Sequence, residues 1–221
     1  TVNGKKPVFF GLDAKNDFYA KNIKNSGDGK VLATLCFDNN NIDVEIPAIG
    51  TYMVTNALAA AAAGKLLGLT DEEIANGVAS YKTVGSRANV INTGKIKIID
   101  DCYNANPTSV RASLDTLSNL DGRKVAILGD MKELGSEELK LHFDTGVYAK
   151  SKGIGTVITV GELAKELAKG ADGKAFDTIE DAKPEILKTI KSGDVVLVKA
   201  SHSMQFENIV EFLKQIGRAH V

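Results

Sequence analysis

Short apolar runs alternate with segments of helical spacing from about residue 95 onward, and this alternation restricts the fold more than any other feature. The apolar runs are 96–100, 125–128, 157–160 and 195–198. The helical segments are 108–119, 137–152, 162–168, 181–191 and 207–216. Units of this kind join parallel strands through helices that cover the faces of the sheet. We therefore predict an α/β domain with a parallel sheet over residues 92–221.

Residues 1–91 show a different pattern. Apolar and polar residues alternate at 30–37 and 42–47, which predicts strands joined by hairpin loops. The alanine-rich segment 56–68 has helical spacing and ends in glycine, so we predict a buried helix there. Thr70 precedes three acidic residues and predicts the start of a second helix, because threonine caps free amide groups and carboxylates favour the positive end of a helix. We place a domain boundary near residues 91–94.

The composition excludes several classes of protein. The 221 residues include 27 basic and 28 acidic side chains, with a formal net charge of −1 and no long basic run that would bind nucleic acid. No apolar stretch reaches membrane-spanning length, and no secretory signal opens the chain. The two cysteines, Cys36 and Cys102, do not indicate a disulfide framework. We expect a monomeric cytoplasmic protein that contacts neither nucleic acid nor a membrane.

The segment 98–107, with the sequence IIDDCYNANP, carries the strongest indication of a site. An apolar strand leads directly into carboxylates and amides, at the carboxyl end where open α/β sheets bind ligands. Pro107 fits the first turn of the next helix, because no amide hydrogen is needed there. Two other predicted strands also end in polar groups, which are Gly129-Asp130 and Ser201-His202. We predict that these groups lie at the same edge of the sheet.

Several motifs occur in an order that resembles the Mur ligases. Upstream of the DD-x-YNANP signature at 100–107 are 50–60 (GTYMVTNALAA), similar to G-x-H-x-V-x-NALAA, and the arginine motif at 85–87 (GSR). Downstream are 128–135 (LGDMKELG), His142 and 198–204 (VKASHSM). The motifs span roughly residues 45–213, so the resemblance covers most of the chain.

The resemblance implies a domain organisation. Full-length Mur ligases have an N-terminal domain that holds the UDP-sugar, a central ATPase domain with a P-loop, and a Rossmann-like C-terminal domain. No Gly-Lys pair in this chain is followed by Ser or Thr, as a P-loop requires. We therefore expect residues 1–91 to be the C-terminal part of a central α/β ATP-binding domain, without its P-loop. Residues 92–221 are then the Rossmann-like ligase domain.

The reaction implied by the resemblance is ATP-driven amide formation, with Mg²⁺ as a further cofactor of the full-length enzyme. Such a ligase adds D-alanyl-D-alanine to UDP-N-acetylmuramoyl-tripeptide through an acyl phosphate in peptidoglycan synthesis, and the isolated chain is expected to be inactive. Three alternatives stay open: another Mur ligase, a folylpolyglutamate synthetase relative, or a non-catalytic module that binds a nucleotide or peptide. The run Tyr103 to Asn106 speaks against the first two. A dinucleotide-dependent oxidoreductase is disfavoured, because no G-x-G-x-x-G follows a strand.

The resemblance also implies roles for single residues. The expected catalytic residues are Arg87 and Asp101; the expected ATP contacts are Asn56, Arg87, Asp101, Tyr103 and Asn104; the expected substrate contacts are Asp130, Ser201 and His202. No metal ligand is expected in this chain. The structural alternatives are a linker arginine at Arg87, helix caps at Asn56 and Asp130, a turn at Asn104 and packing at Tyr103. Asp100 is expected to cap a turn, Asn106 to serve the turn before Pro107, and His142 to be structural.

The chain departs from the family pattern at several positions. Tyr52 stands where histidine is usual, Ala200 where glycine is usual, and His202 where arginine is usual; Ala88 and Asn89 also differ. Because a neutral imidazole has no permanent charge, carboxylate binding by His202 is expected to be weaker than binding by arginine and to depend on pH.

Overall fold

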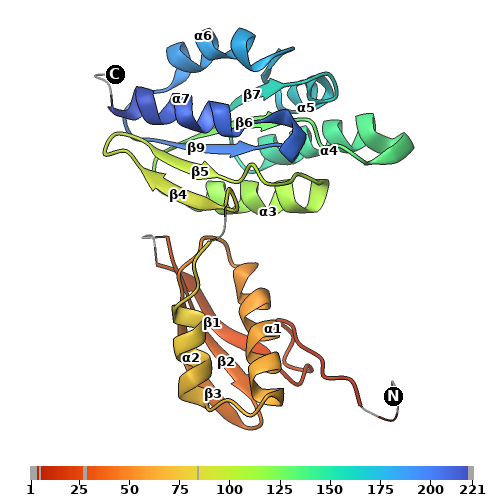
Figure 1. Cartoon of the computed structure of the whole chain (residues 1–221). Helices are drawn as coiled ribbons and strands as arrows, with labels where there is room; N and C mark the ends of the chain where they lie inside the picture. The colour runs from red at the N-terminus through yellow and green to blue at the C-terminus, as the bar shows by residue number, and fades with distance from the viewer. Residues whose placement is uncertain (1–3, 5, 27–28, 84, 219–221) are drawn as a thin grey trace. The chain divides into compact units, whose positions relative to one another are not determined.

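The computed structural model describes residues 4, 6–26, 29–83 and 85–218, and the chain divides into two compact units (Figure 1). Unit 1 comprises Thr1–Lys82 and unit 2 comprises Thr83–Val221. This division lies earlier than the boundary between 91 and 92 expected from the sequence. The reason is a short strand, β4 (Asn89–Asn92), which pairs with the next strand and therefore belongs to unit 2.

Unit 1 contains a three-stranded antiparallel sheet and two helices. The strands are β1 (Tyr19–Asn25), β2 (Val31–Phe37) and β3 (Asn40–Ile46), in the order β1-β2-β3. Asp38 and Asn39 join β2 to β3, and both have positive φ, which favours a tight two-residue hairpin. Apolar residues from the three strands and both helices form one core. The predicted hairpin strands are therefore confirmed.

The helices of unit 1 are α1 (Met53–Leu66) and α2 (Asp71–Ala79). Helix α1 begins before the predicted residue 56, so Asn56 lies inside the helix and the helix-cap alternative for Asn56 is wrong. The start of α2 is as predicted. The Thr70 hydroxyl accepts a hydrogen bond from the Glu73 amide (3.2 Å), and the Glu73 carboxylate accepts one from the Thr70 amide (2.8 Å). This reciprocal pair satisfies two amides at the helix end.

Unit 2 contains a six-stranded sheet in the order β4-β5-β9-β6-β7-β8. The remaining strands are β5 (Lys97–Asp100), β6 (Arg123–Gly129), β7 (Thr156–Val160), β8 (Lys174–Phe176) and β9 (Asp194–Lys199). All pairings are parallel except that of β4 with β5. The four strands expected from the sequence are confirmed, and the short edge strands β4 and β8 are additional.

Helices cover the two faces of this sheet (Figure 1). They are α3 (Pro107–Ser118), α4 (Glu138–Ser151), α5 (Ala164–Ala171), α6 (Ile179–Thr189) and α7 (Glu207–Arg218). Helices α6 and α7 share a core with alternate residues of the central strands, whereas α3, α4 and α5 pack on the other face. The predicted parallel α/β fold is confirmed. In the part of the chain that the structure describes, no helix is long and apolar enough to cross a membrane.

Candidate functional site at the carboxyl edge of the unit 2 sheet

Three neighbouring strands, β5, β9 and β6, deliver polar side chains to the same edge of the sheet. Asp100 pairs in register with Val198, and Lys199 pairs with Leu128, so the ends of the three strands lie level. Asp101, Ser201 and Asp130 follow within two residues of these strand ends. The structure thus brings together the groups expected at the carboxyl edge, where open α/β sheets bind ligands.

Asp101 is the centre of a buried hydrogen-bond network. Its Oδ1 accepts a hydrogen bond from the Ala88 amide at 3.0 Å. Its Oδ2 accepts bonds from the Ser113 hydroxyl at 2.7 Å and from the Lys199 ammonium at 2.6 Å. Lys199 is only 3% exposed and also donates to the Asn104 carbonyl at 2.8 Å. The carboxylate therefore joins the segment before β4 to α3 and to the end of β9.

The segment before β4 holds Arg87 against the loop that follows β5. The Tyr103 amide donates to the Ser86 carbonyl at 3.0 Å, so both neighbours of Arg87 are tied to this loop. The Arg87 guanidinium lies 3.7 Å from the centre of the Tyr103 ring, a cation–π contact. The His202 ring lies 5.9 Å from the same ring. Arg87, Tyr103 and His202 are all exposed, and their contacts make one continuous exposed surface.

The rest of the 100–107 loop is held by local hydrogen bonds. Asp100 accepts a bond from the Cys102 amide at 3.4 Å, as expected for a turn residue. Asn104 is exposed, and its side-chain oxygen accepts a bond from the Ala105 amide at 2.8 Å, consistent with the predicted turn. Asn106 caps α3 in a reciprocal pair with Ser109, and Pro107 is the first residue of α3. Burial, with the nearby Asp100 carboxylate, raises the pKa of the Cys102 thiol.

Asp130 is buried, at 2% exposure, and its carboxylate is already partnered. Its Oδ1 accepts a hydrogen bond from the Ala164 amide at 2.8 Å, at the start of α5, and its Oδ2 pairs with the Lys132 ammonium at 2.6 Å. Gly161 has a φ of 119°, and a Cβ there would lie 2.4 Å from Asp130 Oδ1. The predicted N-cap at Asp130 is wrong, because the next helical turn begins only at Gly135. Asp130 instead accepts a hydrogen bond from the first amide of α5.

Ser201 and His142 hold the loop that follows β6. The buried Ser201 hydroxyl accepts a hydrogen bond from the Lys132 amide at 2.9 Å, and the Ser201 amide donates to the Asp130 carbonyl at 3.1 Å. His142 is fully buried, and its Nε2 accepts a bond from the Met131 amide at 2.9 Å. Its Nδ1 lies 2.7 Å from the Glu138 carbonyl, to which it donates. The neutral tautomer satisfies both bonds, in agreement with a structural role.

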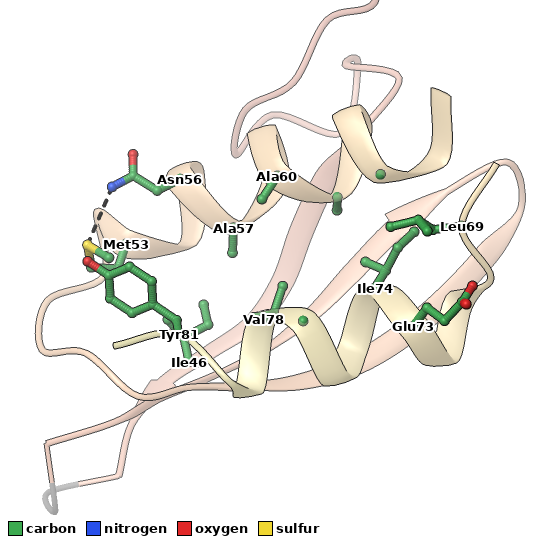
Figure 2. Close-up of a pocket in the computed structure, with 13 residues that line it drawn as sticks. Ile46, Met53, Asn56, Ala57, Ala60, Leu69, Glu73, Ile74, Val78 and Tyr81 are labelled. Carbon is green, nitrogen blue, oxygen red and sulfur yellow. Dashed lines mark hydrogen bonds between the residues drawn. The ribbon is translucent and has the colours of Figure 1, made fainter. Parts of the chain in front are cut away.

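In unit 1, Asn56 lies at the rim of an apolar cavity of about 300 Å³ between α1 and α2 (Figure 2). Its Nδ2 donates to the Met53 sulfur at 3.4 Å, beside the Tyr81 ring. Small residues of both helices, among them Ala57, Ala60 and Gly77, line the cavity and leave its middle open. Asn56 itself is exposed, so its side-chain oxygen faces solvent and is accessible to a ligand.

Two residues of the Asp101 network, Lys199 and Ser113, were not among the candidates from the sequence. Lys199 carried a signal, because it is a charged residue that directly follows an apolar run in a strand. Such a lysine is expected to need a buried partner. Ser113 carried no comparable signal, since a serine in an amphipathic helix is common on either face.

Residues 86–202 match the family profile "Mur ligase, glutamate ligase domain", and residues 2–64 match "Mur ligase middle domain". The UDP-N-acetylmuramoyl-tripeptide–D-alanyl-D-alanine ligase of Bacillus subtilis (strain 168) is 34% identical over 215 residues, which cover 92% of this chain and 46% of that protein. The ligase of the same name from Escherichia coli (strain K12) is 33% identical over 98% of this chain and 49% of its own length.

Solved structures of MurF ligases are similar to this chain as well. A MurF crystal structure from Acinetobacter baumannii superimposes with a TM-score of 0.87 at 29% identity, covering 94% of this chain and 46% of that chain. A MurF ligase from Thermotoga maritima in complex with ADP has a TM-score of 0.84 at 27% identity, covering 95% of this chain and 48% of that chain. The chain spans about half the length of the curated relatives it matches. With both family profiles matched in order, the chain belongs to the Mur ligase family.

Proposed function

We propose that this chain is part of an ATP-dependent ligase that adds D-alanyl-D-alanine to UDP-N-acetylmuramoyl-tripeptide, in peptidoglycan precursor synthesis in the cytoplasm. The proposal rests mainly on the match over 92% of the chain to a Bacillus subtilis protein that is named for that reaction. The exposed surface of Arg87, Tyr103 and His202 supports the proposal, because it offers a cation, an aromatic face and an imidazole at the carboxyl edge of the sheet. We propose that the protein acts as a monomer.

ATP is the proposed nucleotide, and Arg87 is its proposed phosphate contact. Among the described residues, no carboxylate forms a salt bridge with Arg87, and a guanidinium binds phosphate oxygens through two parallel hydrogen bonds. In unit 2, the exposed amide of Asn104 and the Tyr103 ring are proposed to contact the nucleoside, because an amide pairs with its polar edges and the ring stacks on its face. For Asn56 in unit 1, an ATP contact stays a prediction from the sequence. Asp101 is proposed to act through Ala88 and Lys199, since both of its oxygens already accept hydrogen bonds.

The proposed reaction has two steps. A substrate carboxylate oxygen bonds to the γ-phosphorus of ATP while the bond to ADP breaks, which gives an acyl phosphate. The amine of D-alanyl-D-alanine then bonds to the acyl carbon and gives up one proton. Phosphate leaves with the electron pair of the C–O bond and can take up that proton. Negative charge is spread over phosphoryl oxygens in the first step, so a preorganised cation such as Arg87 lowers its barrier.

The acceptor dipeptide is proposed to contact His202. This imidazole is exposed beside Tyr103 and follows β9 directly, whereas Ser201 and Asp130 are buried and partnered within the protein. Ser201 and Asp130 are therefore proposed to shape the loops around the dipeptide. The imidazole N–H of His202 can donate a hydrogen bond to the terminal carboxylate of the dipeptide.

Mg²⁺ prefers clusters of oxygen ligands, and the described residues do not provide one. Of the three buried carboxylates at this edge, Asp101 and Asp130 are each paired with an ammonium group, and Asp100 accepts the Cys102 amide. This arrangement does not fit a Mg²⁺ site, and we assign no metal contact to the described residues of this chain.

The test is calorimetric titration of the purified chain with D-alanyl-D-alanine, with L-alanyl-L-alanine as the control ligand. We expect binding of the D-dipeptide alone, weakened by His202→Ala and unchanged by Leu187→Ala, which changes an exposed side chain of α6. Equal binding of both dipeptides, or binding of neither, would contradict the proposed acceptor role. In a separate assay, the chain is expected not to hydrolyse ATP with Mg²⁺, because its sequence has no Gly-Lys-Ser/Thr loop.

A further inference from the structure

The buried ammonium of Lys199 links the two halves of the carboxyl edge. We propose that Lys199 is a positioning residue that holds Arg87 in place through Asp101 and the 101–104 loop, and so couples Arg87 to the strand that leads to Ser201 and His202. This inference rests on the proposed nucleotide role of Arg87. It assigns a function to a side chain that reaches neither solvent nor ligand.

Lys199 binds two points of the loop after β5. Its Nζ lies 2.6 Å from Asp101 Oδ2 and 2.8 Å from the Asn104 carbonyl oxygen. Removing a lysine from water is unfavourable, and a buried ion pair is often no more stabilising than apolar packing of the same volume. We therefore infer that the main effect of the Lys199–Asp101 pair is on the conformation of the loop, because an ammonium with two fixed acceptors restricts the path of that loop.

The restriction passes from Asp101 to Arg87. The second oxygen of Asp101 accepts the Ala88 amide, and Ala88 has a φ of 52°, a left-handed conformation that a non-glycine residue adopts only when its surroundings hold it. On the other side, the Ser86 carbonyl accepts the Tyr103 amide. Arg87 thus lies between two residues that are both anchored to the 101–104 loop, and its guanidinium rests on the Tyr103 ring.

Lys199 also ends β9, the strand that leads directly to Ser201 and to His202, the proposed dipeptide contact. Ser201 lies two residues further along the chain and holds the loop after β6 through the Lys132 amide and the Asp130 carbonyl. His202 then lies beside Tyr103, with 5.9 Å between the ring centres. A displacement of Lys199 is therefore expected to disturb Arg87 and Tyr103, whereas the bonds of Ser201 to the loop after β6 do not depend on the ammonium.

The first experiment follows Arg87 directly. In the full chain, the Arg87 Nε–Hε signal is assigned by its loss in Arg87→Lys, and its proton is expected to be shifted by the ring current of Tyr103. Lys199→Met should abolish this shift. The matched control is Arg123→Met, which removes the cation from another buried carboxylate, Asp194, at the opposite end of β9. The control should leave the Arg87 signal unchanged.

The second experiment measures ATP affinity by calorimetry in a double-mutant cycle. Lys199→Met is expected to weaken ATP binding by about tenfold in the natural chain and by less than about twofold in an Arg87→Ala background, because a positioning residue acts only through the group it positions. Equal weakening in both backgrounds, or an unchanged Arg87 signal in Lys199→Met, would overturn the inference. If the natural chain binds no ATP, the proposed nucleotide function fails, and the Arg87 signal alone decides the positioning role.

A second variant covers the case in which Lys199→Met does not fold. In Asp101→Asn/Lys199→Met the carboxamide still accepts the Ala88 amide, and no unpaired charge is buried. This variant should recover the melting temperature but not the Arg87 ring-current shift, because the ammonium contact to the Asn104 carbonyl remains lost. Recovery of both would show that Lys199 only neutralises Asp101 and would overturn the inference.

Discussion

The two ends of strand β9 each carry an ion pair with a buried carboxylate, yet the pairs connect different kinds of structure. At the amino end, Arg123 binds Asp194 through two hydrogen bonds of 2.8 and 2.6 Å and also donates to the Thr189 carbonyl. These contacts join the amino ends of β6 and β9 to the end of α6. At the carboxyl end, Lys199 and Asp101 connect β9 to the segment that carries Arg87. An ion pair thus stabilises the amino edge of the sheet, whereas at the carboxyl edge an ion pair positions the exposed cation of Arg87.

The difference also appears in what surrounds each pair. The Arg123 side chain is 41% exposed, so its removal leaves Asp194 close to solvent, and Asp194 keeps the Lys191 amide as a partner. Lys199 is fully enclosed by strands and loop. A buried pair with no access to water is more sensitive to the loss of one member than a pair that water can reach.

The largest expected effect follows from this difference in burial. Lys199→Met should lower the free energy of unfolding of unit 2 by about 3–5 kcal/mol, because it leaves the Asp101 charge buried without a cation. Arg123→Met should cost about 1–3 kcal/mol, since water and the Lys191 amide still serve Asp194. Urea unfolding at neutral pH measures both values. The reverse order of the two losses would show that burial does not set the sensitivity of these pairs.

A second comparison concerns packing at the two edges. A Cβ at Gly129, at the carboxyl end of β6, would lie 2.5 Å from the Phe206 ring and 2.7 Å from Ala200, whereas a Cβ at Gly155, before β7, meets nothing within 4 Å. Gly129→Ala should therefore cost about 1–3 kcal/mol, and Gly155→Ala should be neutral or slightly stabilising. Thermal melting of the two variants checks this expectation. If Gly129→Ala did not change stability, the carboxyl edge would have to be packed loosely enough to accept an added methyl group.

The Cys102 thiol makes stability at the carboxyl edge depend on pH. Burial raises its pKa in the folded chain, whereas the unfolded thiol ionises near pH ~8.5. Above that pH the unfolded state binds fewer protons than the folded state, so folding free energy should be lost by about 1.4 kcal/mol per pH unit. Urea unfolding between pH 8 and about 10 should show a steeper decline for the natural chain than for Cys102→Ala. Parallel curves for the two would exclude this contribution.

The smallest expected effect concerns Tyr103, which is 47% exposed. Tyr103→Leu should change the free energy of unfolding by less than about 0.5 kcal/mol, because exposed side chains contribute little. It should weaken ATP binding by about twofold to fivefold, since Arg87 loses a cation–π contact of about 0.5–1 kcal/mol. Phe143→Leu, which changes an exposed side chain of α4, is the control for calorimetry. Equal affinities for the two variants would remove Tyr103 from the proposed site.

Much of the fold was predictable because the spacing of apolar residues along the chain indicates which positions are buried. The apolar runs that became β5, β6, β7 and β9 are central strands, buried on both faces. Strands β4 and β8 were not predicted, because β4 has only four residues, half of them exposed, and β8 has three. Their pairing is decided by the neighbouring strand and not by their own sequence.

The site was predictable only in part. Motif order identified Arg87, Asp101 and Tyr103, and the structure places these residues together in unit 2. The partnership of Asp101 with Lys199 was not predictable, because the two residues are 98 positions apart and only the strand order brings them together. Asp130 illustrates the converse, since a carboxylate after a strand looked available to substrate but its oxygens are occupied by Ala164 and Lys132.

The most direct test of the difference between the two edges is an NMR titration of the amide-labelled chain with ATP and then with D-alanyl-D-alanine. Signals of residues 86–88 and 101–104 are expected to shift with ATP, and the His202 signal is expected to shift with the dipeptide. Signals around Arg123 and Asp194 should stay in place throughout. Shifts confined to the Arg123–Asp194 end, or spread equally over both ends of β9, would contradict the assignment of ligand binding to the carboxyl edge.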